Sequence, residues 1–274
     1  RPRRSMEDTP AQLVANAMIE KRYALITGAS SGLGAEFAQQ LAALGHPLIL
    51  VARREEKLAA LASTLHEQYG AAVEVIAADL SQPDTPQKIA ATCLASGWQV
   101  DWLINNAGVA GPDLLKDRDW SQQQAFYQLM MLSVAEMCHL FIPSMLERGH
   151  GRVINIASVA ARVPRSGGCN YGPVKAYVVA LSEELHLSVA GQGVNVSALC
   201  PGFTHTEFHE TAGLMDMKNK MAKWLWYEAK VVVCDGINGV EDGKPVVVSG
   251  RLYRWLDPIF QSVWTRRFLR IKAR

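Results

Sequence analysis

The sequence has little of several features that mark other classes of protein. Its formal net charge is only +2 over 274 residues, which is too small to favour nucleic-acid binding. No basic run with interleaved aromatic residues occurs before the last two dozen residues, and internal repeats and low-complexity segments are missing. We therefore expect a folded protein with small-molecule ligands and no nucleic-acid partner.

Cysteine is scarce, and its spacing matches no metal or redox motif. The five cysteines are widely separated and none forms a Cys-x-x-Cys pair: Cys93, Cys138, Cys169, Cys200 and Cys234. His205 and His209 share a helical face, but no third ligand of suitable spacing accompanies them. We expect no metal site and a reducing, cytoplasmic location.

Long apolar runs are also missing. No stretch reaches the roughly 18 uninterrupted apolar residues that a membrane-spanning helix needs, and the N-terminus lacks the apolar core of a signal peptide. The expectation is a soluble protein. Residues 1–20 are interpreted as an N-terminal arm, of which 1–5 (Arg-Pro-Arg-Arg-Ser) are left out of the fold prediction.

The apolar residues that are present suffice for one large domain. They make up 49% of the chain, and its length suits a single α/β domain. From Tyr23 onward, short apolar runs alternate with longer stretches of helical period, which predicts a Rossmann-like, doubly wound parallel sheet in a three-layer α/β/α fold. Six or seven strands are expected, at 22–27, 47–52, 73–77, 100–104, 152–157, 194–199 and 246–248.

Two segments between the expected strands are predicted to be helices, 54–69 and 230–240. Leucines repeat at helical spacing over 54–69, and Gly70 follows where a helix would end. Residues 230–240 also suit a strand that runs into a hairpin turn. We favour a helix there, although Gly236 and Gly239 each weaken it by about 1 kcal/mol.

A glycine-rich segment, Thr-Gly-Ala-Ser-Ser-Gly-Leu-Gly, follows the first expected strand and opens a helix. Its backbone N–H groups and the helix dipole can face a pyrophosphate, and glycine permits the close approach. A purely structural turn is the alternative, but the strand and helix on either side favour a dinucleotide site. The expected cofactor-binding residues are Thr27, Gly28, Ser30, Ser31, Gly32, Leu33 and Gly34.

The end of the second expected strand indicates which cofactor binds. An NAD site usually places an acidic side chain there for the ribose 2′-hydroxyl, whereas this chain has Ala52, Arg53 and Arg54. The Arg53 guanidinium can pair with a 2′-phosphate, so NADP(H) is expected in preference to NAD(H). The alternative is that both arginines only solvate the start of a helix.

Further cofactor contacts are expected where other strands end, because the carboxyl ends of strands line the ligand crevice of an open α/β sheet. Asp79 and Leu80 follow the third strand, and Asn106, Ala107 and Gly108 follow the fourth. Turn capping by asparagine is the alternative for the second group.

Tyr171 and Lys175 stand four residues apart and share one face of an expected helix. The ammonium favours phenolate and lowers the Tyr pKa from about 10, so the phenol can act as acid or base. Ser158 ends the fifth strand, and a loop can bring its hydroxyl beside the phenol. A lone serine there usually caps a helix, but the downstream pair favours a catalytic role.

Together, Thr-Gly-x-x-x-Gly-x-Gly, Asn-Asn-Ala-Gly, Ser, Tyr-x-x-x-Lys and Pro-Gly resemble the short-chain dehydrogenase/reductases over roughly residues 21–250. The resemblance implies that Tyr171 exchanges a proton with the substrate oxygen, that Ser158 holds this oxygen and that Lys175 binds the nicotinamide ribose. It also implies that Asp79 contacts adenine and that Asn106 lies beside the adenosine ribose. Four residues resemble the loop that holds the carboxamide: Pro201, Gly202, Thr204 and Thr206.

The chain departs from the family pattern in three places. Val174 replaces a small residue before the lysine, and Pro173 falls in the first turn of the helix, where proline is tolerated. Met130 stands where many members have an asparagine that supports a water-linked proton path from the lysine. Because a thioether donates no hydrogen bond, the path must be rebuilt from backbone and water, use Ser133, or be impaired.

Two segments bear on substrate and partners. Residues 203–230 are rich in Phe, Met and Trp, and we interpret them as a lid over an apolar substrate, with simple packing onto the domain as the alternative. The basic, aromatic tail at 251–274 indicates either peripheral membrane contact or docking on its own domain or a sister subunit. The resemblance implies a homodimer or homotetramer paired through helices near 117–148 and 170–190.

These features together predict an NADP(H)-dependent oxidoreductase that interconverts a carbonyl and an alcohol on a small hydrophobic substrate, a carbonyl or ketone reductase. A nucleotide-binding regulatory protein of the same fold, with faded catalysis, is the alternative that Met130 motivates.

Overall fold

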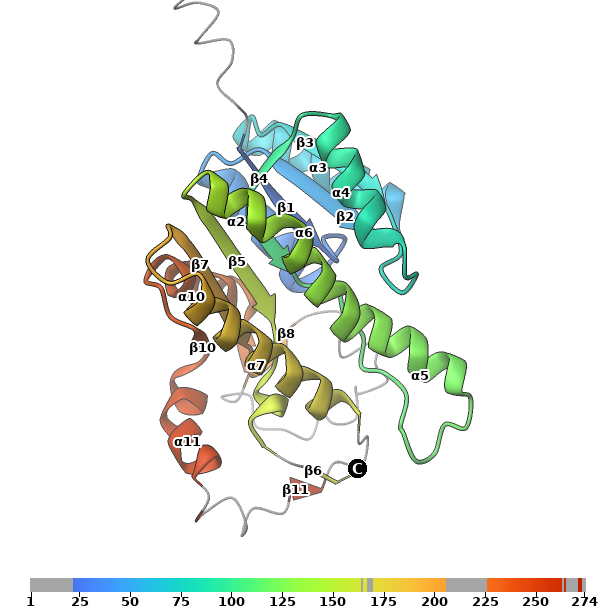
Figure 1. Ribbon diagram of the computed structural model, residues 1–274, viewed down its shortest axis with the longest axis vertical. Helices are drawn as coiled ribbons and strands as arrows, with labels where there is room; N and C mark the ends of the chain where they lie inside the picture. The colour runs from blue at the N-terminus through green and yellow to red at the C-terminus, as the bar shows by residue number, and fades with distance from the viewer. Residues whose placement is uncertain are drawn as a thin grey trace, which may run out of the picture.

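A parallel sheet of seven strands forms the centre of the protein, in the order β10-β7-β5-β4-β1-β2-β3 (Figure 1). The computed structural model describes residues 22–163, 165–166, 170–205, 226–262, 264 and 271–272. All seven predicted strands are confirmed, with ends that shift by one residue at most. They are β1 Arg22–Thr27, β2 Leu48–Ala52, β3 Val73–Ala77, β4 Gln99–Asn105, β5 Gly151–Ile156, β7 Val194–Cys200 and β10 Val246–Val248.

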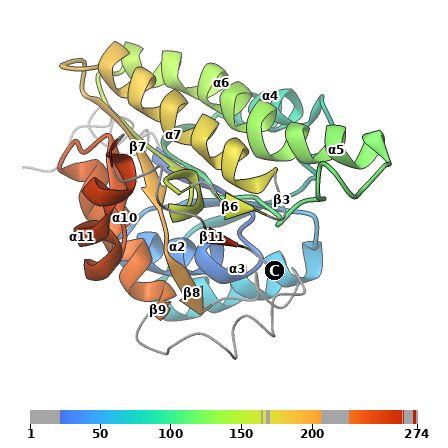
Figure 2. The ribbon, with the colours of Figure 1, turned by 90° about the horizontal axis from the view of Figure 1, so that it is seen from below.

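Helices cover both faces of the sheet, which confirms the three-layer fold (Figure 2). One face carries α2 Gly32–Ala43, α3 Glu55–Tyr69 and α10 Ala229–Glu241, and the other carries α4 Thr85–Ala95, α6 Ser133–Glu147 and α7 Tyr171–Ser188. Before α6 the chain forms α5 Trp120–Tyr127 and a π-helical turn, η1 Gln128–Leu132.

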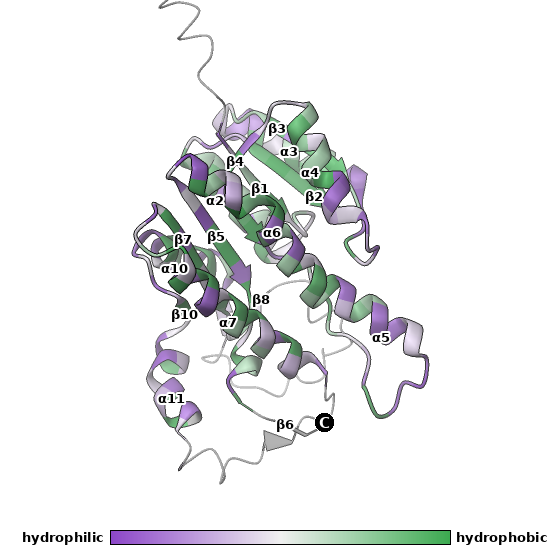
Figure 3. Cartoon of the chain, viewed as in Figure 1, coloured by the Kyte–Doolittle hydropathy of each residue, from purple (hydrophilic) through white to green (hydrophobic). Residues whose placement is uncertain are grey.

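The inner strands are apolar on both sides because each side meets a helical layer. Along β1, Ala24 and Ile26 belong to the core under α2 and α10, while Tyr23 and Leu25 belong to the core under α4 and α6. In Figure 3 the inner strands are largely coloured as hydrophobic. Continuous apolarity in the sequence therefore predicted these strands correctly.

The ambiguous segment before β10 is a helix, as predicted, and its glycines have a packing reason. A Cβ at Gly236 would lie 2.8 Å from Leu199 Cδ2, and one at Gly239 would lie 2.2 Å from Val247 Cγ2. The two glycines thus let α10 lie close on β7 and β10, which offsets their low helix propensity. Gly70 ends α3 in the left-handed conformation, also as predicted.

The continuous helical run Trp120–Glu147 is long and apolar enough to cross a membrane by length and composition. Its α6 part, however, buries Met137, Phe141, Ile142 and Met145 in the core against the sheet. These apolar residues of α6 therefore serve the packing of the domain.

Two small parallel ladders lie outside the main sheet and were not predicted. Phe203–His205 (β8) pairs with Trp226–Glu228 (β9), and Arg165–Ser166 (β6) pairs with Ile271–Lys272 (β11). A last helix, α11, spans Arg251–Gln261. The predicted N-terminal arm lies outside the described residues, as do residues 206–225 of the predicted lid.

Candidate active site

The glycine-rich loop and the end of β4 are held together by one buried threonine. Thr27 Oγ1 accepts hydrogen bonds from the N–H of Asn106 (2.9 Å) and of Ala107 (3.0 Å) and donates one to the Ile104 carbonyl (3.3 Å). In return, Asn106 Nδ2 donates to the carbonyls of Thr27 (2.9 Å) and Gly28 (3.2 Å). Two motifs 79 residues apart therefore form a single rigid unit.

The shape of this loop depends on the missing side chains of its glycines. Gly28 has a φ of +64°, and a Cβ at Gly34 would lie 2.3 Å from the Gly28 carbonyl oxygen. Gly32, with a φ of +57°, begins α2, and the Ser31 side chain makes no hydrogen bond that caps this helix. The first backbone N–H groups of α2 are thus not capped by the Ser31 side chain, and such groups at a helix N-terminus suit a phosphate.

A residue outside the predicted site contacts this loop. Arg54 Nη2 donates hydrogen bonds to Ser30 Oγ (3.0 Å) and Ser31 Oγ (3.1 Å), whereas the predicted Arg53 is exposed beside it. The sequence showed two consecutive arginines after β2, but could not show which of them turns toward the loop.

The other predicted cofactor residues lie at the same edge of the sheet. The Asp79 carboxylate accepts a hydrogen bond from the Ser81 N–H (3.0 Å), and its carbonyl accepts one from Thr85 Oγ1 (2.8 Å). The Leu80 side chain is buried in the core under α4. Asp79 therefore shapes the turn after β3, and the buried Leu80 side chain serves the core.

The predicted catalytic pair lies at the start of α7. Tyr171 is its first residue, and Lys175 Nζ lies 5.8 Å from the centre of the Tyr171 ring, so the two side chains share one face as expected. Lys175 is only 5% exposed and donates a hydrogen bond to the Ile156 carbonyl at the end of β5 (2.6 Å). Burial lowers the pKa of Lys175 to about 8.

Ser158 follows β5 and opens the short 3-10 helix η2 Val159–Ala161. Its Oγ accepts a hydrogen bond from the Ala160 N–H (3.1 Å). The Ser158 oxygen therefore caps the helix η2, as the capping alternative predicted. The Ala160 carbonyl oxygen would lie 3.0 Å from a Cβ at Gly172. The turn that holds Ser158 therefore packs against the first turn of α7, which carries Tyr171.

Buried amides that the prediction missed position the start of α7. Asn170 Nδ2 donates to Gln123 Oε1 of α5 (2.6 Å), and Gln123 Nε2 donates to the Asp113 carbonyl (3.3 Å). Both amide side chains are almost completely buried. Asn170 immediately precedes Tyr171. The Asn170–Gln123 pair therefore fixes the position of the backbone from which the Tyr171 side chain extends.

A second buried chain of polar groups runs beneath the site. Asn105 Nδ2 donates to Asn155 Oδ1 (2.8 Å), Asn155 Nδ2 donates to Ser182 Oγ (3.0 Å), and Ser182 donates to the Val178 carbonyl (2.7 Å). It ties β4 and β5 to α7. The signal in the sequence was an asparagine that follows the apolar residues of each of two neighbouring strands, Asn105 at the end of β4 and Asn155 near the end of β5.

Met130 lies beside the catalytic pair, in the π-helical turn η1. It forms an apolar cluster with Phe126 and Val174, against which Tyr171 packs, and its sulfur accepts a hydrogen bond from the Val109 N–H (3.3 Å). Ser133 Oγ donates to the Leu129 carbonyl (2.7 Å) within its own helix. The hydroxyl proton of Ser133 is thus already used, which disfavours it as a replacement for the asparagine.

The Pro-Gly loop is held against both η2 and the C-terminal helix. The Pro201 carbonyl accepts a hydrogen bond from the Val159 N–H (3.0 Å), and a Cβ at Gly202 would lie 2.1 Å from the Tyr253 ring. Thr204 Oγ1 donates to the Gly202 carbonyl (3.1 Å). Thr206, His209 and the His205 side chain lie outside the described residues.

The chain resembles known proteins along most of its length. The family model for short chain dehydrogenases matches residues 22–216. A sulfoacetaldehyde reductase of Chromohalobacter salexigens is 34% identical over 185 residues, which cover 67% of this chain and 72% of the relative.

Solved structures of such enzymes have the same fold. A short-chain dehydrogenase from Sphingobium yanoikuyae in complex with NADPH superposes with a TM-score of 0.76 at 32% identity, covering 85% of this chain and 91% of the other. One from Burkholderia phymatum in complex with NAD gives 0.75 at 28% identity, covering 88% and 94%. With this fold, this loop and this Tyr-Lys pair, the chain belongs to the short-chain dehydrogenase family of oxidoreductases, which bind nicotinamide cofactors.

Proposed function

We propose that this protein is an NADP(H)-dependent reductase that interconverts a carbonyl and an alcohol on a hydrophobic substrate. The observation that carries the proposal is the buried Lys175 ammonium, 5.8 Å from the centre of the Tyr171 ring. A charge so far from water acts strongly on a neighbouring group. It therefore favours the phenolate form of Tyr171 and makes the phenol a better proton donor.

Tyr171 then gives its proton to the substrate oxygen during reduction and takes it back during oxidation. Ser158 Oγ keeps its own proton for donation, because its hydrogen bond to Ala160 uses it as an acceptor. Both hydroxyls can thus hold one carbonyl oxygen. The bound cofactor supplies or accepts the hydride at the substrate carbon.

The cofactor site is best supported by the glycine-rich loop and the arginines beside it. The amides at the start of α2 suit the pyrophosphate. Arg54 on the loop serines and the exposed Arg53 offer two guanidinium groups for a 2′-phosphate. At the end of β2 the chain has Ala52 and then these two arginines, with no acidic side chain for a ribose 2′-hydroxyl. We therefore propose NADP(H) in preference to NAD(H).

An aromatic cluster follows the Pro-Gly loop and supports an apolar substrate. The Phe203 ring lies 5.3 Å from the Trp226 ring and 6.5 Å from the Tyr253 ring, centre to centre, and Tyr227 lies 6.1 Å from Tyr253. Phe203 begins the predicted lid, Trp226 and Tyr227 lie near its end, and Tyr253 of α11 packs against them. An aromatic cluster of this kind favours the binding of ligands with apolar surface.

The catalytic test uses NADPH and a panel of hydrophobic ketones and aldehydes, with loss of cofactor absorbance as the measurement. Tyr171→Phe should reduce turnover by a factor of about 10² to 10⁴, the usual contribution of a general acid. Tyr177→Phe, on the same helix and partly buried, serves as the matched control and should retain turnover. Equal turnover in the two variants would refute the proposed role of Tyr171.

Cofactor choice is tested by binding titrations of NADPH and NADH. Arg53→Ala and Arg54→Ala should each weaken NADPH by roughly tenfold, the loss of one charge-assisted contact, and leave NADH nearly unchanged. If the wild type binds the two cofactors equally and neither variant alters the ratio, the NADP(H) preference is wrong.

The regulatory alternative rests on Met130, which gives the lysine no hydrogen-bond donor where the family usually has an amide. It would be supported by tight nucleotide binding without turnover of any substrate in the panel. Met130→Asn separates the two functions, because only an enzyme with an impaired proton path should gain turnover from the restored amide.

We also propose a homodimer or homotetramer in a reducing cytoplasm. Leu132 on η1 and Leu187 on α7 are exposed apolar residues. The helices α6 and α7 lie next to each other on one side of the molecule (Figure 2), and both observations support subunit contact through these helices. The four cysteines among the described residues are free thiols, which supports a reducing location.

A further inference from the structure

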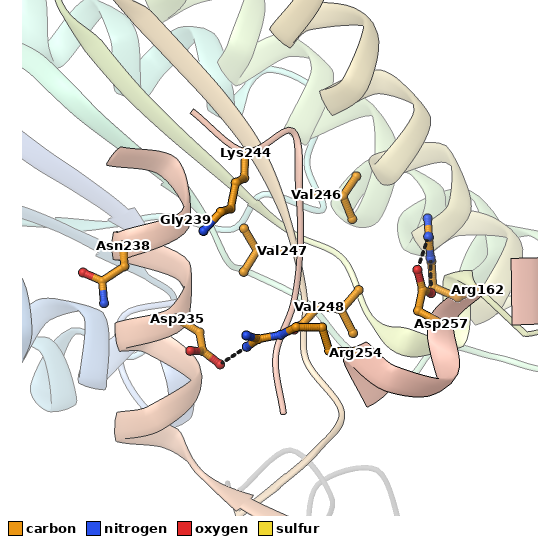
Figure 4. A pocket seen from close by; sticks show the side chains of 10 residues that line it. All are labelled: Arg162, Asp235, Asn238, Gly239, Lys244, Val246, Val247, Val248, Arg254 and Asp257. Carbon is orange, nitrogen blue, oxygen red and sulfur yellow. Dashed lines mark hydrogen bonds and ion pairs between the residues drawn. The ribbon is translucent and has the colours of Figure 1, made fainter. Parts of the chain in front are cut away.

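The helix α11 contacts the segment of the chain that carries Ser158. Asp257 of α11 accepts two hydrogen bonds from the Arg162 guanidinium, one from Nε (2.8 Å) and one from Nη2 (2.5 Å). Figure 4 shows these two side chains pointing toward each other. Gln261, one turn later on α11, donates from Nε2 to the Arg162 carbonyl (2.9 Å). The helix therefore holds Arg162 at both its side chain and its backbone.

The Arg162–Asp257 pair differs from an ordinary surface ion pair. Its side chains are only 17% and 18% exposed, so solvent and salt screen their attraction less than that of an exposed pair. Two parallel hydrogen bonds between a guanidinium and a carboxylate also fix the direction of approach. The pair thus holds two segments, 95 residues apart in the sequence, in one defined arrangement.

Arg162 lies at the end of the short turn that Ser158 begins. The Arg162 N–H donates to the Val159 carbonyl (3.0 Å), and the Ala161 N–H donates to the Ser158 carbonyl (3.0 Å). The helix η2 between them has only three residues, and so short a helix has little stability of its own. Its position, and with it that of the Ser158 side chain, therefore depends on contacts with other elements.

The helix α11 also holds the Pro-Gly loop, which contacts η2. A Cβ at Gly202 would lie 2.1 Å from the Tyr253 ring of α11, so the ring packs directly on the backbone of the loop. The Pro201 carbonyl accepts a hydrogen bond from the Val159 N–H of η2 (3.0 Å). Two routes of contact thus run from α11 to η2, one through the ion pair and one through this loop.

We infer that Asp257 is a positioning residue, which holds Arg162 and thereby fixes η2 and the Ser158 hydroxyl beside the substrate oxygen. This role rests on the proposed function, in which Ser158 and Tyr171 together bind that oxygen. Both hydroxyls must lie within hydrogen-bond distance of it at the same time, and a displacement of about 1 Å can lower the rate about a hundredfold. An ion pair outside the reacting groups can therefore control turnover.

A second ion pair provides a matched control for stability alone. Arg152 Nε lies 2.8 Å from Glu241 of α10, and the Arg152 side chain is 15% exposed. The pair therefore resembles the Arg162–Asp257 pair in contact distance and in the burial of its arginine. Arg152 lies near the start of β5, however, whereas Ser158 follows the end of this strand. Glu241→Gln thus removes a comparable contact without touching η2.

The kinetic test measures kcat with NADPH and a ketone that the wild type reduces. Asp257→Asn should lower kcat about tenfold to a hundredfold, the loss expected from a misplaced hydroxyl, and Glu241→Gln should leave it within about twofold. Asp257→Glu keeps the carboxylate and should restore most of the loss. Arg162→Lys keeps the charge but loses the bidentate contact, and should lower kcat in the same direction as Asp257→Asn.

The Ser158→Ala background separates positioning from stability. With no hydroxyl left to position, Asp257→Asn should lower kcat there by less than about twofold further, because two changes that act through one group are not additive. The same loss in both backgrounds would overturn the inference, as would a kcat of Asp257→Asn equal to that of Glu241→Gln.

Hydrogen exchange provides a readout that needs no substrate. The amides of residues 157–163 should exchange about tenfold faster in Asp257→Asn, the factor for one lost charge-assisted hydrogen bond, and should be unchanged in Glu241→Gln. Unchanged exchange in Asp257→Asn would show that the pair does not hold η2. A wild type without turnover refutes the proposed function, whereas an active wild type with an equally active Asp257→Asn refutes this inference alone.

Discussion

The glycine-rich loop and the catalytic pair differ in how their polar groups are satisfied. At the loop, Thr27 and Asn106 exchange five hydrogen bonds with the backbone at 2.9 to 3.3 Å, and each donor meets an acceptor within the protein. At the pair, the buried Lys175 amine makes one hydrogen bond to protein, to Ile156, among those resolved in the described residues. The hydrogen bonds of the loop stabilise the folded state, whereas the buried charge of Lys175 lowers its stability.

The size of that cost follows from the pKa of Lys175. Its lowering from the ordinary 10.5 to about 8 corresponds to about 3 kcal/mol of unfavourable free energy when the amine is charged. A buried charge of this kind is typical of functional sites. The comparison teaches that the glycine-rich loop is built for rigidity, whereas the buried lysine carries the charge on which the proposed reaction depends.

The largest effect is expected from Gly34→Ala at the loop. The new Cβ would lie 2.3 Å from the Gly28 carbonyl oxygen and 2.6 Å from Asn106 Nδ2, so the backbone itself must move. We expect a loss of at least about 3 kcal/mol in the free energy of unfolding, the upper range for overpacking, measured by urea denaturation.

Gly45→Ala is the control for this change. Gly45 has a φ of +87° and nothing within 4 Å of a would-be Cβ, so only backbone strain of about 1 kcal/mol is expected. Equal losses in the two variants would show that the tight contact at Gly34 is unimportant.

Thr27→Val tests the hydrogen bonds of the loop without changing its volume much. The change leaves the amides of Asn106 and Ala107 without their acceptor, and unsatisfied buried groups cost about 1 to 3 kcal/mol each. We expect a loss of about 3 kcal/mol in urea denaturation. Thr27→Ser keeps the hydroxyl and should lose less than half as much. A valine variant as stable as the serine variant would contradict the rigid-unit interpretation.

Lys175→Met should act in the opposite direction, with a gain in stability and a loss of activity. At pH 7 the variant avoids the cost of the buried charge but loses the hydrogen bond to Ile156, so a net gain of about 2 kcal/mol is expected. Turnover should fall to the level of Tyr171→Phe.

The pH dependence of this gain has a definite sign. Because the folded pKa of Lys175 is lowered to about 8, the cost is complete below pH 8 and disappears as the pH rises toward 10.5, where the unfolded chain also loses its proton. The advantage of the variant should therefore shrink between pH 8 and pH 10.5 in urea denaturation. A gain that stays constant over this range would mean that the pKa of Lys175 is the same in the folded and the unfolded chain, so that burial does not lower it.

Local patterns predicted most of the fold and the shared face of the two residues proposed for catalysis. Apolar runs between helical stretches located all seven strands, and the spacing of Tyr171 and Lys175 predicted their shared face. Both depend on neighbours in sequence, through the two-residue period of strands and the near four-residue period of helices. The same reasoning located Gly70 at the end of α3.

Contacts between distant residues were not predicted. The β6–β11 ladder, the Arg162–Asp257 pair and the Asn170–Gln123 amides join segments between 47 and 106 residues apart. The local sequence around one residue of such a contact does not indicate which distant residue it meets. The choice of Arg54 over Arg53 at the loop serines likewise depends on which side chain the turn after β2 directs toward the glycine-rich loop.

The sequence by itself determined the order of strands and helices along the chain, the glycine-rich loop and the shared helical face of Tyr171 and Lys175, because each depends on side chains within a few positions of one another. Only the tertiary structure decided that Lys175 is buried enough to lower its pKa, that Met130 packs beside the phenol, and that Trp255 faces outward while Tyr253 faces in. Burial and orientation depend on which distant segments come to lie against each residue, and that is fixed when the helices close over the sheet.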